Sequence, residues 1–438
     1  MRRTLFLAVA TLALAGVAGR LALAHGAKGP TPASSLRASG FTERAQRDTQ
    51  IAVWGQALDA DSTSAIALGQ LAALHLQRAR EGGSWGDYLE AERYARRSIG
   101  KRTVRNGKTA VTLVSVLLAQ HRFAEARAVA QDLVRRETDV PQYRSLLGEV
   151  AMELGDYPLA GSMLDSLWSQ RAILSVAPRL ARWAELNGRA AEARALLEQA
   201  RDDALARPDV PKETKSWFHF RVGDLALRAG RLRSAESAFR AGLAIEPDDP
   251  RLLAGMARLF AVRGDPAEAI AWGDRAIAAQ LDPGTLGVVG DAYAAMGDRA
   301  KAAEYFHTME VAVTAQPGQY HRAWSLHLLD HDQRGADVLK QARASLNERR
   351  DVYGYDLVAW GLHKAHRDRD AQAAMQHALQ LGTPDASLWF HDGMIARALG
   401  DSTHARASLE RALELNPNFH AQQPGEARAA LDSLGRGR

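Results

Sequence analysis

Hydrophobic residues between Leu286 and Thr314 recur at helical spacing in two short blocks, which the pair Gly297-Asp298 separates. A spacing of i, i+3, i+4 and i+7 is typical of a helix that buries one face. The segment therefore predicts two amphipathic helices joined by a turn, and neither helix has enough apolar surface to be stable alone. The positions that carry this pattern are Leu286, Val289, Gly290 and Tyr293 in the first helix, and Ala302, Phe306 and Met309 in the second.

The same turn pattern recurs along most of the chain. A turn residue is followed five positions later by alanine in ten places, and the interval between neighbouring turns is nearly constant, except for a longer one between Gly188 and Gly230. Because both the period and the alanine repeat together, chance is a poor explanation even in an alanine-rich chain. The ten pairs are Gly86/Ala91, His121/Ala126, Gly155/Ala160, Gly188/Ala193, Gly230/Ala235, Gly264/Ala269, Gly297/Ala302, His331/Ala336, His366/Ala371 and Gly400/Ala405.

A helix–turn–helix unit with a period of about 34 residues resembles the tetratricopeptide repeat. Further positions support the resemblance, although Arg343 departs from it at a place where a small residue is usual. Proline, which cannot continue a helix, follows the second helix in two units. The matching residues are glycine seven positions before the turn (Gly148, Gly223, Gly290, Gly393), an aromatic nine after it (Phe239, Phe306), a small residue twelve after it (Ala200, Ala276, Ala378, Ala412), and the prolines Pro247 and Pro417.

The resemblance implies an all-α solenoid, a right-handed superhelix of about ten repeat units over residues 63–417. Residues 41–62 resemble the second helix of a unit and are expected to form a half-repeat or cap, and residues 418–438 a capping helix and tail. The long interval places an insertion near 200–216, where Pro208 and Pro211 break the helix. That break is either a hinge between two halves or the end of a longer second helix followed by an ordinary loop.

The N-terminus has the plan of a secretory signal peptide over residues 1–24. Arg2 and Arg3 precede an apolar run, and Ala22 and Ala24 supply the small residues of a cleavage site. We expect cleavage after Ala24, a flexible leader over residues 25–40, and a periplasmic or secreted protein with no membrane span in the mature chain. An uncleaved N-terminal anchor is the alternative. The chain has no cysteine, which excludes disulfides and a lipoprotein anchor and suits an oxidising compartment.

Charge and motifs narrow the possible functions further. A net charge of +5 over 438 residues is not the concentrated basic stripe that nucleic-acid binding needs. The sequence carries no nucleotide-binding glycine loop, no metalloprotease or serine-hydrolase motif and no paired cysteine. We therefore predict no enzyme and no cofactor.

Histidines gather in the C-terminal part of the sequence. His327 and His331 are four residues apart, and His363 and His366 are three apart in the next unit. Because His331 and His366 occupy equivalent turn positions, stacking brings the two pairs to one edge, where they could bind a metal or sense pH. The alternative is four solvated histidines too far apart to share an ion.

The inner groove of such a superhelix is lined by the first helix of each unit. In this family the residues six and ten positions before the turn face inward, which in the C-terminal units predicts a wall of aromatic and polar side chains. Such a mixture suits a peptide, although Trp360 and Phe390 could instead be core residues between units. The predicted peptide-binding residues are Tyr353, Asp356, Trp360, His363, Phe390 and Met394, with Phe220 and Arg258 further along the groove.

The sequence thus predicts an exported, non-enzymatic scaffold or adaptor that binds a protein or peptide in its groove. By analogy with exported members of the family, a cell-envelope assembly or export process is the expected setting. A periplasmic metal-handling protein that uses the C-terminal histidines is the alternative.

Overall fold

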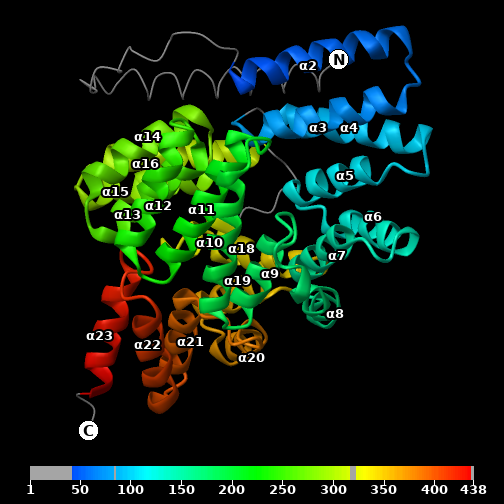
Figure 1. Ribbon diagram of the computed structural model, residues 1–438. Helices are drawn as coiled ribbons and strands as arrows, with labels where there is room; N and C mark the ends of the chain where they lie inside the picture. The colour runs from blue at the N-terminus through cyan, green and yellow to red at the C-terminus, as the bar shows by residue number, and fades with distance from the viewer. Residues whose placement is uncertain (1–41, 83–84, 316–321, 436–438) are drawn as a thin grey trace.

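The computed structural model describes residues 42–82, 85–315 and 322–435. These ranges contain twenty-two α-helices, one short 3-10 helix and no strand (Figure 1). The predicted signal peptide, 1–24, and leader, 25–40, lie outside the described residues. No described helix is both long and apolar enough to cross a bilayer. The helices are α2 Glu43–Ala60, α3 Ala65–Arg80, α4 Trp85–Lys101, α5 Gly107–Ala119, α6 Phe123–Arg136, α7 Pro141–Leu154, α8 Tyr157–Leu164, η1 Asp165–Gln170, α9 Ala177–Leu186, α10 Ala190–Ala206, α11 Lys212–Arg228, α12 Leu232–Ile245, α13 Pro250–Arg263, α14 Pro266–Ala279, α15 Pro283–Ala295, α16 Arg299–Thr314, α17 Arg322–Asp330, α18 Gly335–Ser345, α19 Val352–Lys364, α20 Asp368–Ala378, α21 Ala386–Ala398, α22 Ser402–Leu415 and α23 Gln423–Gly435.

The repeated turns have one backbone conformation. In the turn at Gly297 (φ 84°) the amide of Asp298 donates to the carbonyl of Tyr293 at 3.0 Å, which closes the first helix in a Schellman motif. The side chain of Asp298 then accepts from the amide of Lys301 at 3.0 Å and caps the second helix. Eight of the ten predicted turn residues have this left-handed φ: His121, Gly155, Gly188, Gly230, Gly264, Gly297, His366 and Gly400.

Two units depart from the predicted register. In the first unit the left-handed residue is Gly82, and Gly86 lies inside α4. In the unit assigned to His331 the left-handed residues are Asp332 (φ 53°) and Arg334 (φ 48°), and the predicted Ala336 is exposed. The buried residues of α18, the second helix of this unit, are Val338, Leu339 and Ala342. The repeat pattern of α18 therefore begins one residue earlier than predicted. The exposed Arg343 is therefore no departure from the family, because the small residue of this unit is Ala342.

Small residues let the two helices of a unit approach closely. A Cβ atom on Gly223 would lie 2.4 Å from Phe239, and one on Gly290 would lie 2.3 Å from Phe306. The predicted glycine and aromatic positions therefore face each other in these units. The alanine of the repeat is buried in nine of its ten predicted places, at Ala91, Ala126, Ala160, Ala193, Ala235, Ala269, Ala302, Ala371 and Ala405.

The longest interval between turns contains the two 17-residue helices α10 and α11. Residues 200–206 continue α10, and the chain between the two helices, 207–211, carries both prolines of the predicted insertion. Ala204, Val210 and Phe218 pack together beneath this connection. The extra residues of this interval therefore lengthen the two helices, and a small hydrophobic cluster packs beneath their connection.

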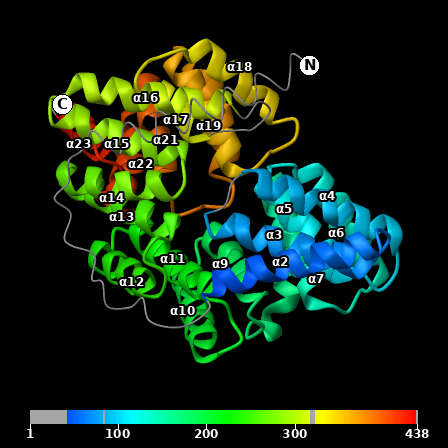
Figure 2. The same ribbon diagram turned by 90° about the horizontal axis from the view of Figure 1, so that it is seen from above.

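The superhelix returns to contact itself in the second half of the chain. From above, the chain runs around a ring from α2–α7 through α10–α12 and α13–α16 to α18–α19 (Figure 2). Hydrogen bonds then join one turn to the next: Val352 N donates to Tyr157 Oη at 2.8 Å, 195 residues away, and Thr383 Oγ1 donates to the Leu186 carbonyl at 2.8 Å, 197 residues away.

Two further hydrogen bonds join the same two turns of the superhelix. The Arg350 amide donates to the carbonyl of Leu154 at 3.2 Å, and Asn416 Nδ2 donates to the carbonyl of Leu227 at 3.1 Å. We call these contacts the seam: residues 153–157, 186 and 227–228 on the first turn, with 349–352, 383 and 416 on the second. The seam brings the second turn of the superhelix into direct contact with the first.

Candidate functional site

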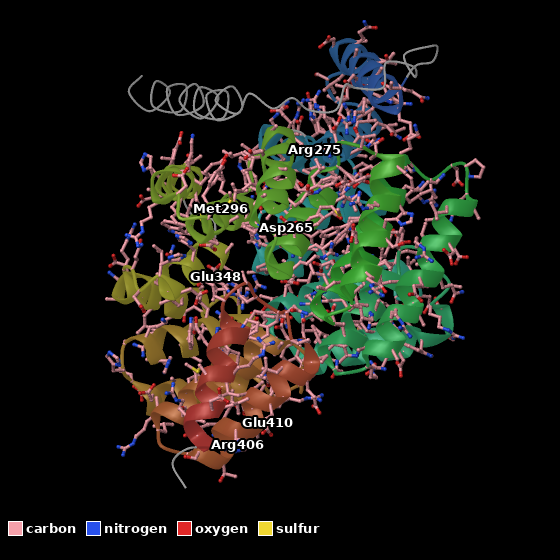
Figure 3. All side chains as sticks on the ribbon, turned by 90° about the vertical axis from the view of Figure 1, so that its left-hand side faces the viewer. Asp265, Arg275, Met296, Glu348, Arg406 and Glu410 are labelled. Atoms are coloured by element: carbon pink, nitrogen blue, oxygen red, sulfur yellow. The ribbon has the colours of Figure 1, made fainter. Side chains whose placement is uncertain are left out.

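The interior contains a cavity of about 860 Å³, to which first helices of several units contribute. On the outer surface, the charged side chains of Arg275, Glu348 and Glu410 are exposed to solvent (Figure 3). Both turns of the superhelix contribute to the cavity. Its lining includes Tyr88 from α4, Phe220 from α11, Ala254 and Arg258 from α13, Gly287 and Asp291 from α15, Leu326 and His327 from α17, His331 after it, and His391 from α21.

Arginines dominate the inner faces of α9, α11 and α13. Asp224 forms ion pairs with Arg228 and with Arg258, at 3.1 Å in each pair. Burial opposes the ionisation of Asp224, but the guanidinium groups of Arg228, Arg258 and Arg221 outweigh it and hold the pKa of the carboxyl well below its usual range. Burial together with the charge of Arg228 lowers the pKa of Arg221. Arg258, with 40% of its side chain exposed, extends from this network to the cavity, whose lining contains four arginines and four aspartates.

A carboxylate and two imidazoles meet at the cavity wall. One ligand atom each from Asp291, His327 and His331 lies within 4.8 Å of the others, and His331 Nε2 is 3.0 Å from Asp291 Oδ1. The hydrogen bond to Asp291 raises the pKa of His331, whereas burial and the neighbouring His331 lower the pKa of His327 to about 4. The three side chains thus supply one carboxylate and one neutral imidazole beside a second imidazole.

The other histidine pair lies elsewhere. His363 Nδ1 is 2.6 Å from Asp368 Oδ1 and its ring stacks on Trp360, while His366 is exposed at a left-handed turn position. The four histidines therefore do not form one group among the described residues. Asp291 completes the group of His327 and His331, and it was not predicted there because it lies on the first helix of the preceding unit.

Most of the predicted groove wall is covered by the chain itself. The ring of Phe390 is fully buried, and Trp360 is 4% exposed with its Nε1 donating to Asp330 Oδ1 at 2.9 Å. Phe419 packs on Phe390, and Gln423 Nε2 lies 3.5 Å from Asp330 Oδ2. This corrects the expectation that Trp360 and Phe390 face a groove, because residues after α22 fold back over α21. Their large rings belong to the core between units.

The remaining predicted residues divide between the cavity and a buried network. Asp356 is fully buried between Arg322 (2.7 Å) and His391 (2.6 Å). Burial opposes its ionisation, but His391 and Arg322 outweigh it and lower the pKa of Asp356. Tyr353 lies against the guanidinium groups of Arg182 and Arg322, 5.4 and 5.1 Å from its ring centre. Met394 is half-buried and packs on the C-terminal core.

Of the eight predicted peptide-binding residues, Phe220 and Arg258 line the cavity, and their role in binding stays a prediction. Lining residues outside that prediction include Tyr88, Arg322 and His391. Tyr88 lies in the first unit, where the turn was misplaced. Arg322 lies ten positions before Asp332, the first observed left-handed residue of its unit, so the shifted register explains why it was missed. No repeat position marks His391 as facing a cavity.

Family models of the tetratricopeptide repeat match residues 111–167, 221–284 and 386–419. No curated protein is significantly similar in sequence. Similar solved structures include PilW, a widely conserved type IV pilus biogenesis factor (17% identity, 51% of this chain and 99% of that chain, TM-score 0.40). They also include the Cut9–Hcn1 hetero-tetramer of the APC/C (13%, 89% and 93%, TM-score 0.35) and a tetratricopeptide repeat protein from Parabacteroides merdae ATCC 43184 (17%, 61% and 99%, TM-score 0.34). The matched segments and the repeated helical hairpins show that this chain contains tetratricopeptide repeats, and proteins with such repeats bind protein partners.

Proposed function

We propose that this protein is an exported scaffold that binds a segment of another protein in the central cavity and has no catalysis of its own. The observation that carries the proposal is the cavity itself, which several units line from both turns of the superhelix. Ligand sites in proteins are typically concave spaces of about 300–1,000 Å³, and this one falls in that range.

The chemistry of the lining suits a peptide. Phe220 and Tyr88 offer aromatic contact area, and Arg258 offers charge-assisted hydrogen bonds to carboxylate or carbonyl oxygens. A mixture of apolar and polar groups in one space recognises side chains of both kinds. Because the lining contains arginines and aspartates in equal number, a segment with both acidic and basic residues is the better match.

Filling the cavity tests this function. Ala254 lines the cavity from α13, so Ala254→Trp places an indole in the space that the ligand would occupy. The matched control is Ser237→Trp, an exposed position on α12. We expect a partner recovered from envelope extract with the wild type and the control to be lost from the Ala254 variant, and its purified affinity to fall about tenfold or more. Equal binding by both variants would place the partner elsewhere on the molecule.

Export is the second part of the proposal, and the N-terminal sequence supports it. We expect the protein to occur in the periplasmic or secreted fraction with His25 as its first residue, as N-terminal sequencing would show. Replacing Ala22 and Ala24 by arginine should block cleavage and leave a heavier, membrane-attached precursor. A full-length wild type in the membrane would favour the uncleaved anchor, and one in the cytoplasm would end the proposal of export.

We further propose that the partner belongs to a cell-envelope assembly or export process. This setting rests on the N-terminal sequence and on the analogy with exported repeat proteins. Identification of the recovered partner by mass spectrometry would test it, and a partner confined to the cytoplasm would contradict it.

A further inference from the structure

Three side chains with metal-ligating atoms converge on one wall of the cavity. They come from α15 and from the end of α17, which are the first helices of neighbouring units. His327 and His331 are one helical turn apart, so their rings lie on the same face, with ring centres 4.3 Å apart. Asp291 approaches from α15, and its Oδ1 is 3.0 Å from His331 Nε2.

We propose that Asp291, His327 and His331 bind one Zn²⁺ ion, with a fourth coordination position open to the cavity. Two imidazoles and one carboxylate are ligands that zinc accepts, and three protein ligands with one open position is the arrangement of zinc sites that receive an exogenous ligand. This inference goes beyond the proposed function and does not depend on it, because the ion binds whether or not the cavity receives a peptide.

The distances suit such a site. Tetrahedral ligation with zinc–ligand bonds of about 2.0–2.2 Å places the ligand atoms roughly 3.3–3.6 Å apart. The ligand atoms of the three side chains already lie within 4.8 Å of one another, so small side-chain rotations bring them to that separation. All three residues are half-buried or buried, so the surrounding protein holds each ring and carboxylate in place.

The cavity supplies room for the fourth ligand. Asp291, His327 and His331 all line it. Asp330 lies next to the group, but its carboxylate already accepts a hydrogen bond from Trp360 Nε1 at 2.9 Å. A water molecule, or an acidic or histidine side chain of a bound peptide, would therefore complete the coordination.

The ion would also link two repeat units. Within the described residues, the helix α17 spans Arg322–Asp330. Its contact with α15 through the ion would hold these two helices at a fixed distance. We therefore expect zinc to raise the melting temperature of the protein as well as to bind it.

The test is zinc titration of the untagged, metal-free full chain, with isothermal calorimetry for affinity and elemental analysis for stoichiometry. We expect one zinc ion per wild-type chain, and an affinity loss of about tenfold or more in Asp291→Asn and in His327→Gln. The matched control is the double variant His363→Gln/His366→Gln, which removes the other histidine pair and should bind zinc as the wild type does.

Two further measurements distinguish a loss of folding from a loss of zinc binding. Far-UV circular dichroism in the presence of chelator should be the same for wild type and variants, and only the wild type and the control should gain thermal stability on adding zinc. Zinc bound equally by the Asp291 and His327 variants, or no binding by a folded wild type, would overturn the site. Loss of zinc only in the His363/His366 variant would overturn it as well.

Discussion

Replacing Phe390 by alanine is expected to lower the free energy of unfolding by about 3–5 kcal/mol, because it empties a large volume in a fully buried place. The ring is 0% exposed and contacts Trp360, His391 and Phe419, with ring centres 5.7–6.0 Å apart. Urea denaturation followed by circular dichroism measures the loss. Hydrogen exchange should locate it in the C-terminal units, because each repeat contacts mainly its neighbours.

The matched control is Met296→Ala. Met296 is 56% exposed, at the end of α15 (Figure 3), so its truncation should change the stability by less than about 0.5 kcal/mol. A similar loss in both variants would contradict the burial of Phe390. The prediction also bears on binding experiments: a variant at Trp360 or Phe390 would lose a partner by unfolding, and variants at the cavity lining are the sharper probes.

Gly155→Ala is expected to open the seam and to destabilise the fold by about 2–5 kcal/mol, the sum of a left-handed alanine and an overpacked contact. The residue has a φ of 74°, and a Cβ atom there would lie 2.1 Å from the carbonyl oxygen of Arg350. The second turn must therefore move away at this point. We expect faster amide exchange at Arg350 and Val352, whose amides bond to the first turn, and a larger radius of gyration in solution scattering.

Gly264→Ala separates the cost of a left-handed alanine from the cost of the overpacked contact. Gly264 has a φ of 84°, but no atom within 4 Å would meet its Cβ, so its alanine variant carries the backbone cost alone, about 1–2 kcal/mol. The exchange of Arg350 and Val352 should stay unchanged in this control. If the two variants behaved alike at those amides, the contact between turns would not persist in solution.

The repeat units could be predicted because they are local. A turn residue in the left-handed region, a capping aspartate after it and a buried alanine five residues on involve only a few neighbours along the chain. The histidines His121 and His366 were identified at such turns by phase alone, and both have positive φ. The register failed at Gly86, which lies inside α4, and at His331, after which α18 begins its pattern one residue early.

The candidate site was only partly predictable, because it depends on contacts between units. Phe220 and Arg258 were placed on the inner face and do line the cavity. Asp291 was not linked to His327 and His331, since the two histidines follow it in the sequence by about one repeat. Trp360 and Phe390 have the right phase for the inner face, yet Phe419 and the chain after α22 cover them.

The sequence by itself determined the helical hairpins, most of their turns, their number and the type of repeat, since each depends on spacings within a single repeat period. The tertiary structure alone decided that the superhelix closes on itself, so that Val352 meets Tyr157, 195 residues away, with a cavity inside. The physical reason is that small rotations between neighbouring units add up along the chain. A small rotation between neighbouring units is set by how their side chains pack, and its sum over several units determines whether Gly155 meets Arg350 or faces solvent.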